Sequence, residues 1–138
     1  MHNCSTLIIH CTDFRLINKI REWMNENSLT DDCDVISIAG ASKDLVDGSK
    51  EVQDFILKQI NTSYSLHNVR KIILLHHNDC GAYKTTYNFL DEEAEFAQHL
   101  EDMTAAEEIL KNCFENIEVK KIWAEIDPDE NEVEFIEL

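Results

Sequence analysis

The chain has 138 residues, 43% of them hydrophobic, which is enough for one α/β core and too few for two. Its 12 basic and 28 acidic side chains give a formal net charge of -16, and the acidic ones are concentrated after residue 90. Because nucleic acids and anionic membranes are bound by clustered Lys and Arg, this charge argues against both as partners. We expect a single domain over residues 1–138 whose acidic half is a solvated face.

No stretch of the sequence approaches the ~20 consecutive apolar residues that a membrane span needs. The chain also lacks the basic segment and apolar run that are typical of a secretory signal, so we expect a soluble, cytoplasmic protein. Five cysteines, an odd number, favour metal binding or free thiols over a disulfide framework. Cys4, Cys33 and Cys113 have no ligand-like spacing, and no function is predicted for them.

The first half of the chain alternates strand and helix patterns. Continuous apolar runs indicate buried strands, whereas apolar residues that recur every three or four positions indicate helices with one buried face. The elements expected here are a buried strand over residues 6–11, a helix over residues 15–27, a second strand over residues 34–40 with a small-residue exit, and a helix over residues 49–61 capped by Asp47-Gly48-Ser49.

The second half begins with the most strongly apolar strand of the chain, residues 71–77, in which Ile72 to Leu75 leave no face for water. Residues 82–114 are helical in pattern, with a break near Asp91. The predicted inward stripe of that region consists of Phe96, Leu100, Met103, Ile109, Leu110 and Cys113. A strand over residues 119–126, a turn and a returning antiparallel strand over residues 133–138 complete the chain.

This order of elements predicts an α/β fold with three layers. Its central sheet is expected to be mainly parallel, with about four strands and a C-terminal antiparallel edge strand. In such open sheets, functional groups gather beyond the carboxyl ends of the strands, near the point where the strand order reverses. The residues that follow the two most apolar strands are therefore the candidates for chemistry.

Each of these two strands runs into chemically versatile side chains. The strand over residues 6–11 ends in Cys11 and is followed by Asp13 and Arg15, and the strand over residues 71–77 ends in His77, followed by Cys80. Zn²⁺ accepts thiolates and imidazoles in a tetrahedron, and three protein ligands leave a fourth position free. We therefore expect Cys11, His77 and Cys80 to hold one Zn²⁺, with Gly81 available for a tight backbone path.

The two groups together, Cys11-x-Asp13-x-Arg15 and His77-x-x-Cys80-Gly81, resemble the pattern of the β-class carbonic anhydrases, and the resemblance extends from Thr6 to the C-terminus. It implies reversible hydration of carbon dioxide to bicarbonate by zinc-bound hydroxide. It also implies that Asp13 accepts a hydrogen bond from that hydroxide while Arg15 holds the carboxylate off the metal. If the pair separates, Asp13 can become the fourth ligand.

The same resemblance implies a pocket for carbon dioxide or bicarbonate and a homodimer or higher even oligomer. The expected pocket residues are Phe14, Ala39, Gly40 and Gly81. The chain departs from the family at the start, because the ten residues before Cys11 cannot form the usual helical arm. It also departs in the residues expected to form the pocket walls. Phe14 replaces a small residue, and Ser37-Ile38 precede the Ala-Gly pair where the family commonly has Arg-Asn.

Two other functions fit the same residues. One is a related zinc hydrolase of a carbon dioxide analogue such as carbonyl sulfide or carbon disulfide, which needs the same metal site with different pocket walls. The other is a non-catalytic zinc-binding module. The presence of both Asp13 and Arg15 argues against the second, because a structural metal site does not need a gate for its fourth position.

The other histidines are expected to have structural or surface positions. His76 is predicted to lie in the core or to support the metal site, and His10 to pack on the face of its strand opposite Cys11. His2, His67 and His99 are predicted to be exposed.

Overall fold

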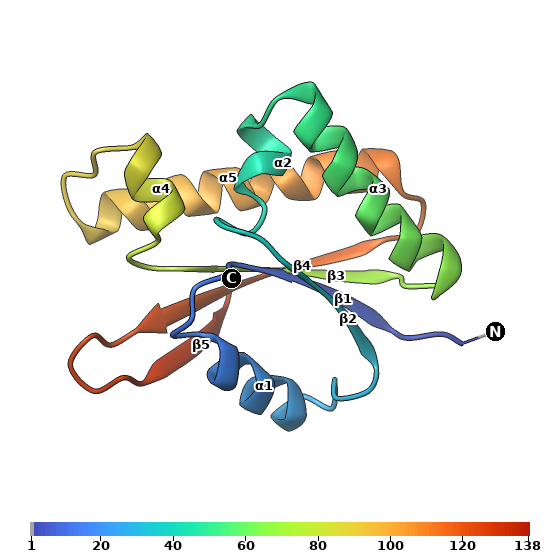
Figure 1. The fold of residues 1–138 in the computed structure, drawn as a ribbon, viewed down its shortest axis with the longest axis horizontal. Coiled ribbons are helices and arrows are strands. Elements are labelled where there is room, and N and C mark those ends of the chain that lie inside the picture. The colour runs from blue at the N-terminus through green and yellow to red at the C-terminus, as the bar shows by residue number, and fades with distance from the viewer. Residues whose placement is uncertain (1) are drawn as a thin grey trace.

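A computed structural model describes residues 2–138, which form one five-stranded sheet with helices on both faces (Figure 1). The elements in chain order are β1 (Thr6–His10), α1 (Ile17–Glu26), β2 (Cys33–Ser37), α2 (Lys43–Asp47), α3 (Lys50–Leu66), β3 (Lys71–His77), α4 (Gly81–Thr86), α5 (Glu92–Cys113), β4 (Glu118–Ile126) and β5 (Val133–Glu137). Within this part of the chain, no helix combines the length and the apolar character needed to cross a bilayer.

The strand order is β2-β1-β3-β4-β5. The strands β2, β1, β3 and β4 are parallel to one another. The edge strand β5 runs antiparallel to β4. Figure 1 shows α1 on one side of the sheet, with α2, α3, α4 and α5 on the other. The predicted three-layer, mainly parallel α/β fold with an antiparallel C-terminal edge strand is therefore confirmed.

The central strand β3 is buried on both faces, which explains its unbroken apolar sequence. Successive side chains of a strand point to opposite faces, so Ile72 and Leu74 join the core that α2, α3 and α5 cover. Ile73 and Leu75 join the core on the α1 side, where Leu16 and Ile20 cover them. Two apolar layers therefore fix the position of the end of β3.

Side-chain caps mark the starts of the two long helices. Ser49 accepts a hydrogen bond from Val52 N at 3.3 Å at the start of α3, and Asp91 accepts one from Ala94 N at 2.8 Å at the start of α5. The Asp91 cap is the reason for the predicted break in the helical pattern.

On the other face of the sheet, Trp23 of α1 stacks on Phe135 of β5, with ring centroids 5.4 Å apart.

Several predicted boundaries were wrong. The strand β2 ends at Ser37 and not at residue 40, because the chain turns there and Gly40 adopts a φ of +76°. The short helix α2 was not predicted, since only five residues form it and they carry no helical period. In addition, α1 begins at Ile17 instead of Arg15, and α3 continues to Leu66 instead of ending near Asn61.

The buried face of α5 also differs from the prediction. Cys113 is exposed, whereas Glu95, His99 and Asp102 are buried together with Met103. These three polar residues lie at positions i, i+4 and i+7, so they share one side of the helix. The prediction that His99 is exposed was therefore wrong, because its Nδ1 pairs with His76 Nδ1 inside the fold.

The strand order places the sheet's switch point between β1 and β3. The chain leaves β1 toward β2 on one side and then crosses back to form β3 on the other side of β1. The register pairs His10 of β1 with Leu75 of β3, so the carboxyl ends of the two strands lie next to each other. The groups that follow these ends are the ones predicted to meet there.

Candidate metal centre

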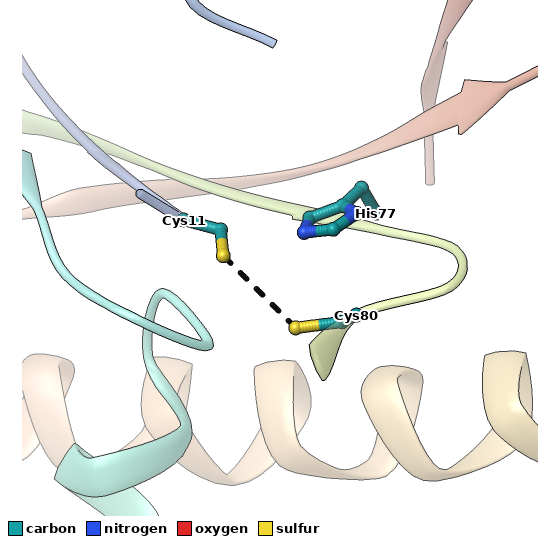
Figure 2. A group of neighbouring side chains, drawn as sticks. All are labelled: Cys11, His77 and Cys80. Atoms are coloured by element: carbon teal, nitrogen blue, oxygen red, sulfur yellow. Dashed lines mark hydrogen bonds between the residues drawn. The ribbon is translucent and has the colours of Figure 1, made fainter. Parts of the chain in front are cut away.

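Cys11, His77 and Cys80 come together at the switch point (Figure 2). Cys11 follows β1, His77 is the last residue of β3, and Cys80 is the N-cap residue of α4. One donor atom of each lies within 4.8 Å of the others, and the two Sγ atoms are 4.0 Å apart. Two thiolates about 2.3 Å from a tetrahedral Zn²⁺ would be about 3.8 Å apart, so this spacing fits such an ion.

The backbone carbonyl of Asn78 fixes the orientation of the His77 imidazole. Its Nδ1 lies 2.7 Å from Asn78 O, so Nδ1 donates to this carbonyl and Nε2 carries the lone pair. In residues 2–138, this Nε2 is one of two buried side-chain polar atoms without a hydrogen-bond partner. An unpaired nitrogen in a dry interior costs free energy, and a metal ion beside the two thiols would satisfy it.

The loop after β2 supports the first thiol. Gly40 N–H donates to Cys11 Sγ at 3.4 Å. A side chain at Gly40 is excluded by its positive φ and by space, because a Cβ atom would lie 3.0 Å from Lys43 Cβ and 3.2 Å from Ala82 Cβ. Gly40 was predicted to line a substrate pocket, and the structure places it against the Cys11 thiol.

The two thiols strongly influence each other's ionisation. The hydrogen bonds that Cys11 accepts from the Cys80 thiol and from Gly40 N–H lower the pKa of Cys11 far below its usual value despite its burial. The same contact raises the pKa of Cys80, because a second negative charge would lie beside the first. A divalent cation removes this repulsion, and two thiolates neutralise its charge. The donor set therefore fits Zn²⁺.

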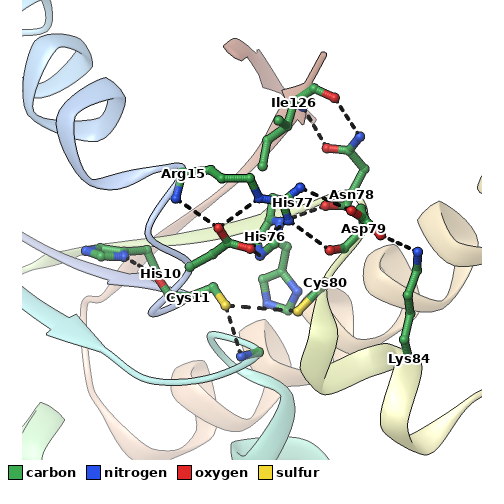
Figure 3. Close-up of polar contacts among 12 residues, drawn as sticks. His10, Cys11, Arg15, His76, His77, Asn78, Asp79, Cys80, Lys84 and Ile126 are labelled. Atoms are coloured by element: carbon green, nitrogen blue, oxygen red, sulfur yellow. Dashed lines mark hydrogen bonds and ion pairs between the residues drawn. The ribbon is translucent and has the colours of Figure 1, made fainter. Parts of the chain in front are cut away.

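Asp13 and Arg15 form a two-point ion pair beside His77. Figure 3 shows Arg15 and its second acidic partner, Asp79. Arg15 Nε donates to Asp13 Oδ1 at 3.0 Å, and Arg15 Nη2 donates to Oδ2 at 2.7 Å. The hydrogen bonds from Arg15 hold the pKa of the Asp13 carboxyl below its usual range, so it is ionised at neutral pH. Asp13 Oδ2 lies 3.9 Å from His77 Nε2 and thus faces the unpaired nitrogen of this imidazole.

Arg15 has a second acidic partner that fixes its position. Its Nη1 lies 3.1 Å from Asp79 Oδ2, and its Nη2 donates to Asp79 O at 3.1 Å. Lys84 also forms an ion pair with Asp79. The left-handed residue of this turn is Asp79, with a φ of +54°, and not Gly81, where a Cβ atom would meet open space. The tight backbone path expected at Gly81 is therefore made two residues earlier, at Asp79.

A buried carboxylate missed by the sequence analysis holds the turn that carries Cys80. Glu95 of α5 accepts hydrogen bonds from Asp79 N at 2.8 Å and from Cys80 N at 3.1 Å. Its side chain is 5% exposed. The available signal was the spacing of Glu95, His99 and Asp102, which puts three polar residues on the face where the apolar stripe continues.

Two neutral histidines lie behind this turn. Ser42 N–H donates to His76 Nε2 at 3.3 Å, so the proton of His76 is on Nδ1, which lies 2.9 Å from His99 Nδ1. Burial lowers the pKa of His76 to about 3 and that of His99 to about 2, so both stay uncharged at neutral pH. The predicted core position of His76 is confirmed, and His10 is also buried. These contacts tie α5 to the loop that carries Gly40.

The remaining predicted pocket residues surround the site from outside. Phe14 is 85% exposed, and Ala39 and Gly81 are also exposed. A cleft of about 720 Å³ adjoins the site through Arg15, Asp79 and Glu95, but neither the metal ligands nor the four predicted pocket residues line it. The rest of its wall is formed by Asn78, Lys84, Glu92, Glu125, Ile126, Asp127, Pro128, Glu132, Val133 and Glu134.

Comparisons with known proteins agree with this site and fold. A family model described as "Putative carbonic anhydrase" matches residues 1–137. An uncharacterized protein of Rickettsia bellii is 35% identical over 127 residues, which cover 86% of this chain and 75% of that protein. A second uncharacterized protein, from Rickettsia conorii, is 33% identical over 127 residues, which cover 86% of this chain and 66% of that protein.

A solved structure shows the same architecture. The crystal structures of two tetrameric β-carbonic anhydrases from Sordaria macrospora include a chain that matches this one with a TM-score of 0.64, covering 99% of this chain and 82% of that chain. The sequence identity is 14%, so this likeness concerns the fold alone. Because the family model spans nearly the whole sequence and the fold is that of the β class, the chain belongs to the β-carbonic anhydrase-like family.

Proposed function

We propose that this protein catalyses the reversible hydration of carbon dioxide to bicarbonate, with Zn²⁺ held by Cys11, His77 and Cys80. The observation that carries the proposal is a buried pair of thiols 4.0 Å apart, beside an imidazole nitrogen without a partner. Thiolates and imidazole are ligands that Zn²⁺ prefers, and three protein ligands are typical of catalytic sites. Membership of the carbonic anhydrase family supports the choice of reaction.

Zinc, when bound, would act as a Lewis acid that brings the pKa of water from ~15.7 toward ~7. The residues around the ion would determine how that water is oriented. Asp13 is ionised and faces the same space as His77 Nε2, so it can accept a hydrogen bond from the attacking oxygen and orient its lone pair. The carboxylate would thus act as a positioning group and not as a ligand.

Arg15 holds this carboxylate in place. Both oxygens of Asp13 accept hydrogen bonds from Arg15, and Asp79 holds the guanidinium from its other side. A carboxylate without such a partner would turn toward the nearest cation, because a hard oxygen is a competent zinc ligand. We infer that Arg15 keeps the fourth position available by keeping Asp13 engaged.

The first prediction concerns the pH dependence of hydration and the ion pair between Asp13 and Arg15. In the zinc-loaded protein, hydration of carbon dioxide should increase from pH 7 to pH 9, because two thiolates make zinc a weaker Lewis acid than neutral ligands do. Arg15→Ala should lose about a hundredfold in kcat/KM while zinc stays bound, since Asp13 is released toward the metal. Asp13→Ala should lose about ten- to a hundredfold. Stopped-flow assays and metal analysis of each protein measure these effects.

The matched control is Lys50→Ala, which removes an exposed ion pair with Asp54 on α3. This variant should keep wild-type kinetics. Zinc-loaded, folded wild-type protein that shows no hydration at either pH would contradict the proposal. In that case, hydrolysis of carbonyl sulfide or carbon disulfide would be the next activity to measure.

The second prediction concerns Glu95. Because its carboxylate accepts from the backbone N–H groups of both Asp79 and Cys80, Glu95→Gln leaves one of them without a good acceptor. We expect zinc affinity to fall by about ten- to a hundredfold, as measured by competition with a chelator. Glu92→Gln, at an exposed position of the same helix, is the control. Equal affinities for the wild type and Glu95→Gln would show that the turn does not depend on this residue.

The third prediction concerns assembly. We propose a homodimer or a higher even oligomer. The strand β2 lies at the edge of the sheet and pairs with β1 on one side only, and its Val35 is 48% exposed. Phe14, next to the site, is 85% exposed. Sedimentation equilibrium at micromolar concentration should show an even number of subunits, and Phe14→Ser should shift the protein toward smaller species. A wild type that is only monomeric at this concentration would rule out the assembly.

A further inference from the structure

A second group of metal-binding side chains lies at the opposite ends of the strands. Cys4 precedes β1, Asp34 is in β2, and His67 is the C-cap residue of α3. One donor atom of each lies within 4.8 Å of the others, and His67 Nδ1 is 2.6 Å from Asp34 Oδ2. His67, which was predicted to be exposed, is half-buried, and it lies beside Cys4, for which no function was predicted, because residues distant in sequence meet here.

Backbone contacts hold these residues in place, and the Cys4 thiol itself donates to Thr6 O at 3.7 Å. Cys4 N–H donates to His67 O at 3.0 Å, which joins the start of the chain to the end of α3. The next residue, Ser5, donates from its N–H and its hydroxyl to the Asp32 carboxylate, at 2.9 and 2.6 Å. The segment that carries Cys4 is therefore fixed on both sides, and its thiol is positioned before any ion arrives.

The chemistry of the donors indicates which ion they would bind. A thiolate and a carboxylate together neutralise a divalent cation, and an imidazole completes a set of borderline softness. Such a set favours Zn²⁺ over Mg²⁺ or Ca²⁺, which prefer oxygen ligands only. The side chains of His67 and Asp34 are 30% and 27% exposed, so an ion can reach them from solvent. His2 is a candidate fourth donor, because its ring centroid lies 4.8 Å from that of His67.

We propose that Cys4, Asp34 and His67 form a second Zn²⁺ site, separate from the one at Cys11, His77 and Cys80. Cys11 follows Cys4 by seven positions in a largely extended segment, which corresponds to roughly 20 Å. The second site joins the N-terminal segment, the edge strand β2 and the end of α3. Its ion stabilises this junction and is not within reach of the reacting groups.

Zinc stoichiometry tests this proposal. The metal-free protein is dialysed against excess zinc and analysed for bound metal, and wild-type chains should bind two ions. The double variant Cys4→Ser with His67→Gln and the single variant Cys80→Ser should each bind one, whereas all three substitutions together should abolish binding. Cys113→Ser, which removes an exposed thiol outside both groups, is the control and should bind two.

A second readout is independent of activity. In the Cys80→Ser protein, excess zinc should raise Tm, and adding Cys4→Ser should remove that increase, because only ions bound to the folded state stabilise it. One ion in the wild type that disappears with Cys80→Ser would overturn the proposal, as would an unchanged stoichiometry in the double variant. One ion that disappears with Cys4→Ser alone would support this site and contradict the zinc ligands of the proposed enzyme.

Discussion

The constraint on which the structure depends is the burial of two thiols and one imidazole where β1 and β3 end side by side. Cys11, Cys80 and His77 are at most 6% exposed, yet the two sulfur atoms cannot both ionise without a cation between them. The unpartnered Nε2 of His77 points to the same need. The parallel strands β1 and β3, buried on both faces, supply the rigid frame that keeps these three groups together in spite of this cost.

Polar groups from separate elements surround Cys11, His77 and Cys80 and pair with one another. Gly40 N–H and the Glu95 carboxylate fix the two cysteines from the sides of the β2 exit loop and α5. Outside them, Arg15 engages Asp13, and Asp79 in turn engages Arg15. Because the guanidinium is shared, the position of Asp13 depends on a turn more than sixty residues away in sequence. The charge next to the ligands is thus set by the fold and not by one local motif.

The sequence was sufficient for the parts that local patterns determine. Four consecutive apolar residues, Ile72 to Leu75, identify a doubly buried strand, and the cap at Asp91 separates two helices. The meeting of Cys11 with Cys80 was predictable, since strand ends in a parallel sheet lie at one edge. In contrast, the roles of Glu95, His99 and Cys4 depend on partners distant in the chain, and an isolated acid or thiol carries no signal of such contacts. The short helix α2 and the end of β2 at Ser37 depend on the turn through Gly40, which local propensity does not reveal.

The most direct test of the central claim is the coordination of the ion itself. Zinc K-edge X-ray absorption on the Cys4→Ser protein, loaded with one Zn²⁺ per chain, reports the ligands of the buried site alone. The account predicts two sulfur atoms at about 2.3 Å and two nitrogen or oxygen atoms at about 2.0–2.1 Å. A first coordination sphere made only of nitrogen and oxygen, or one with a single sulfur, would contradict it.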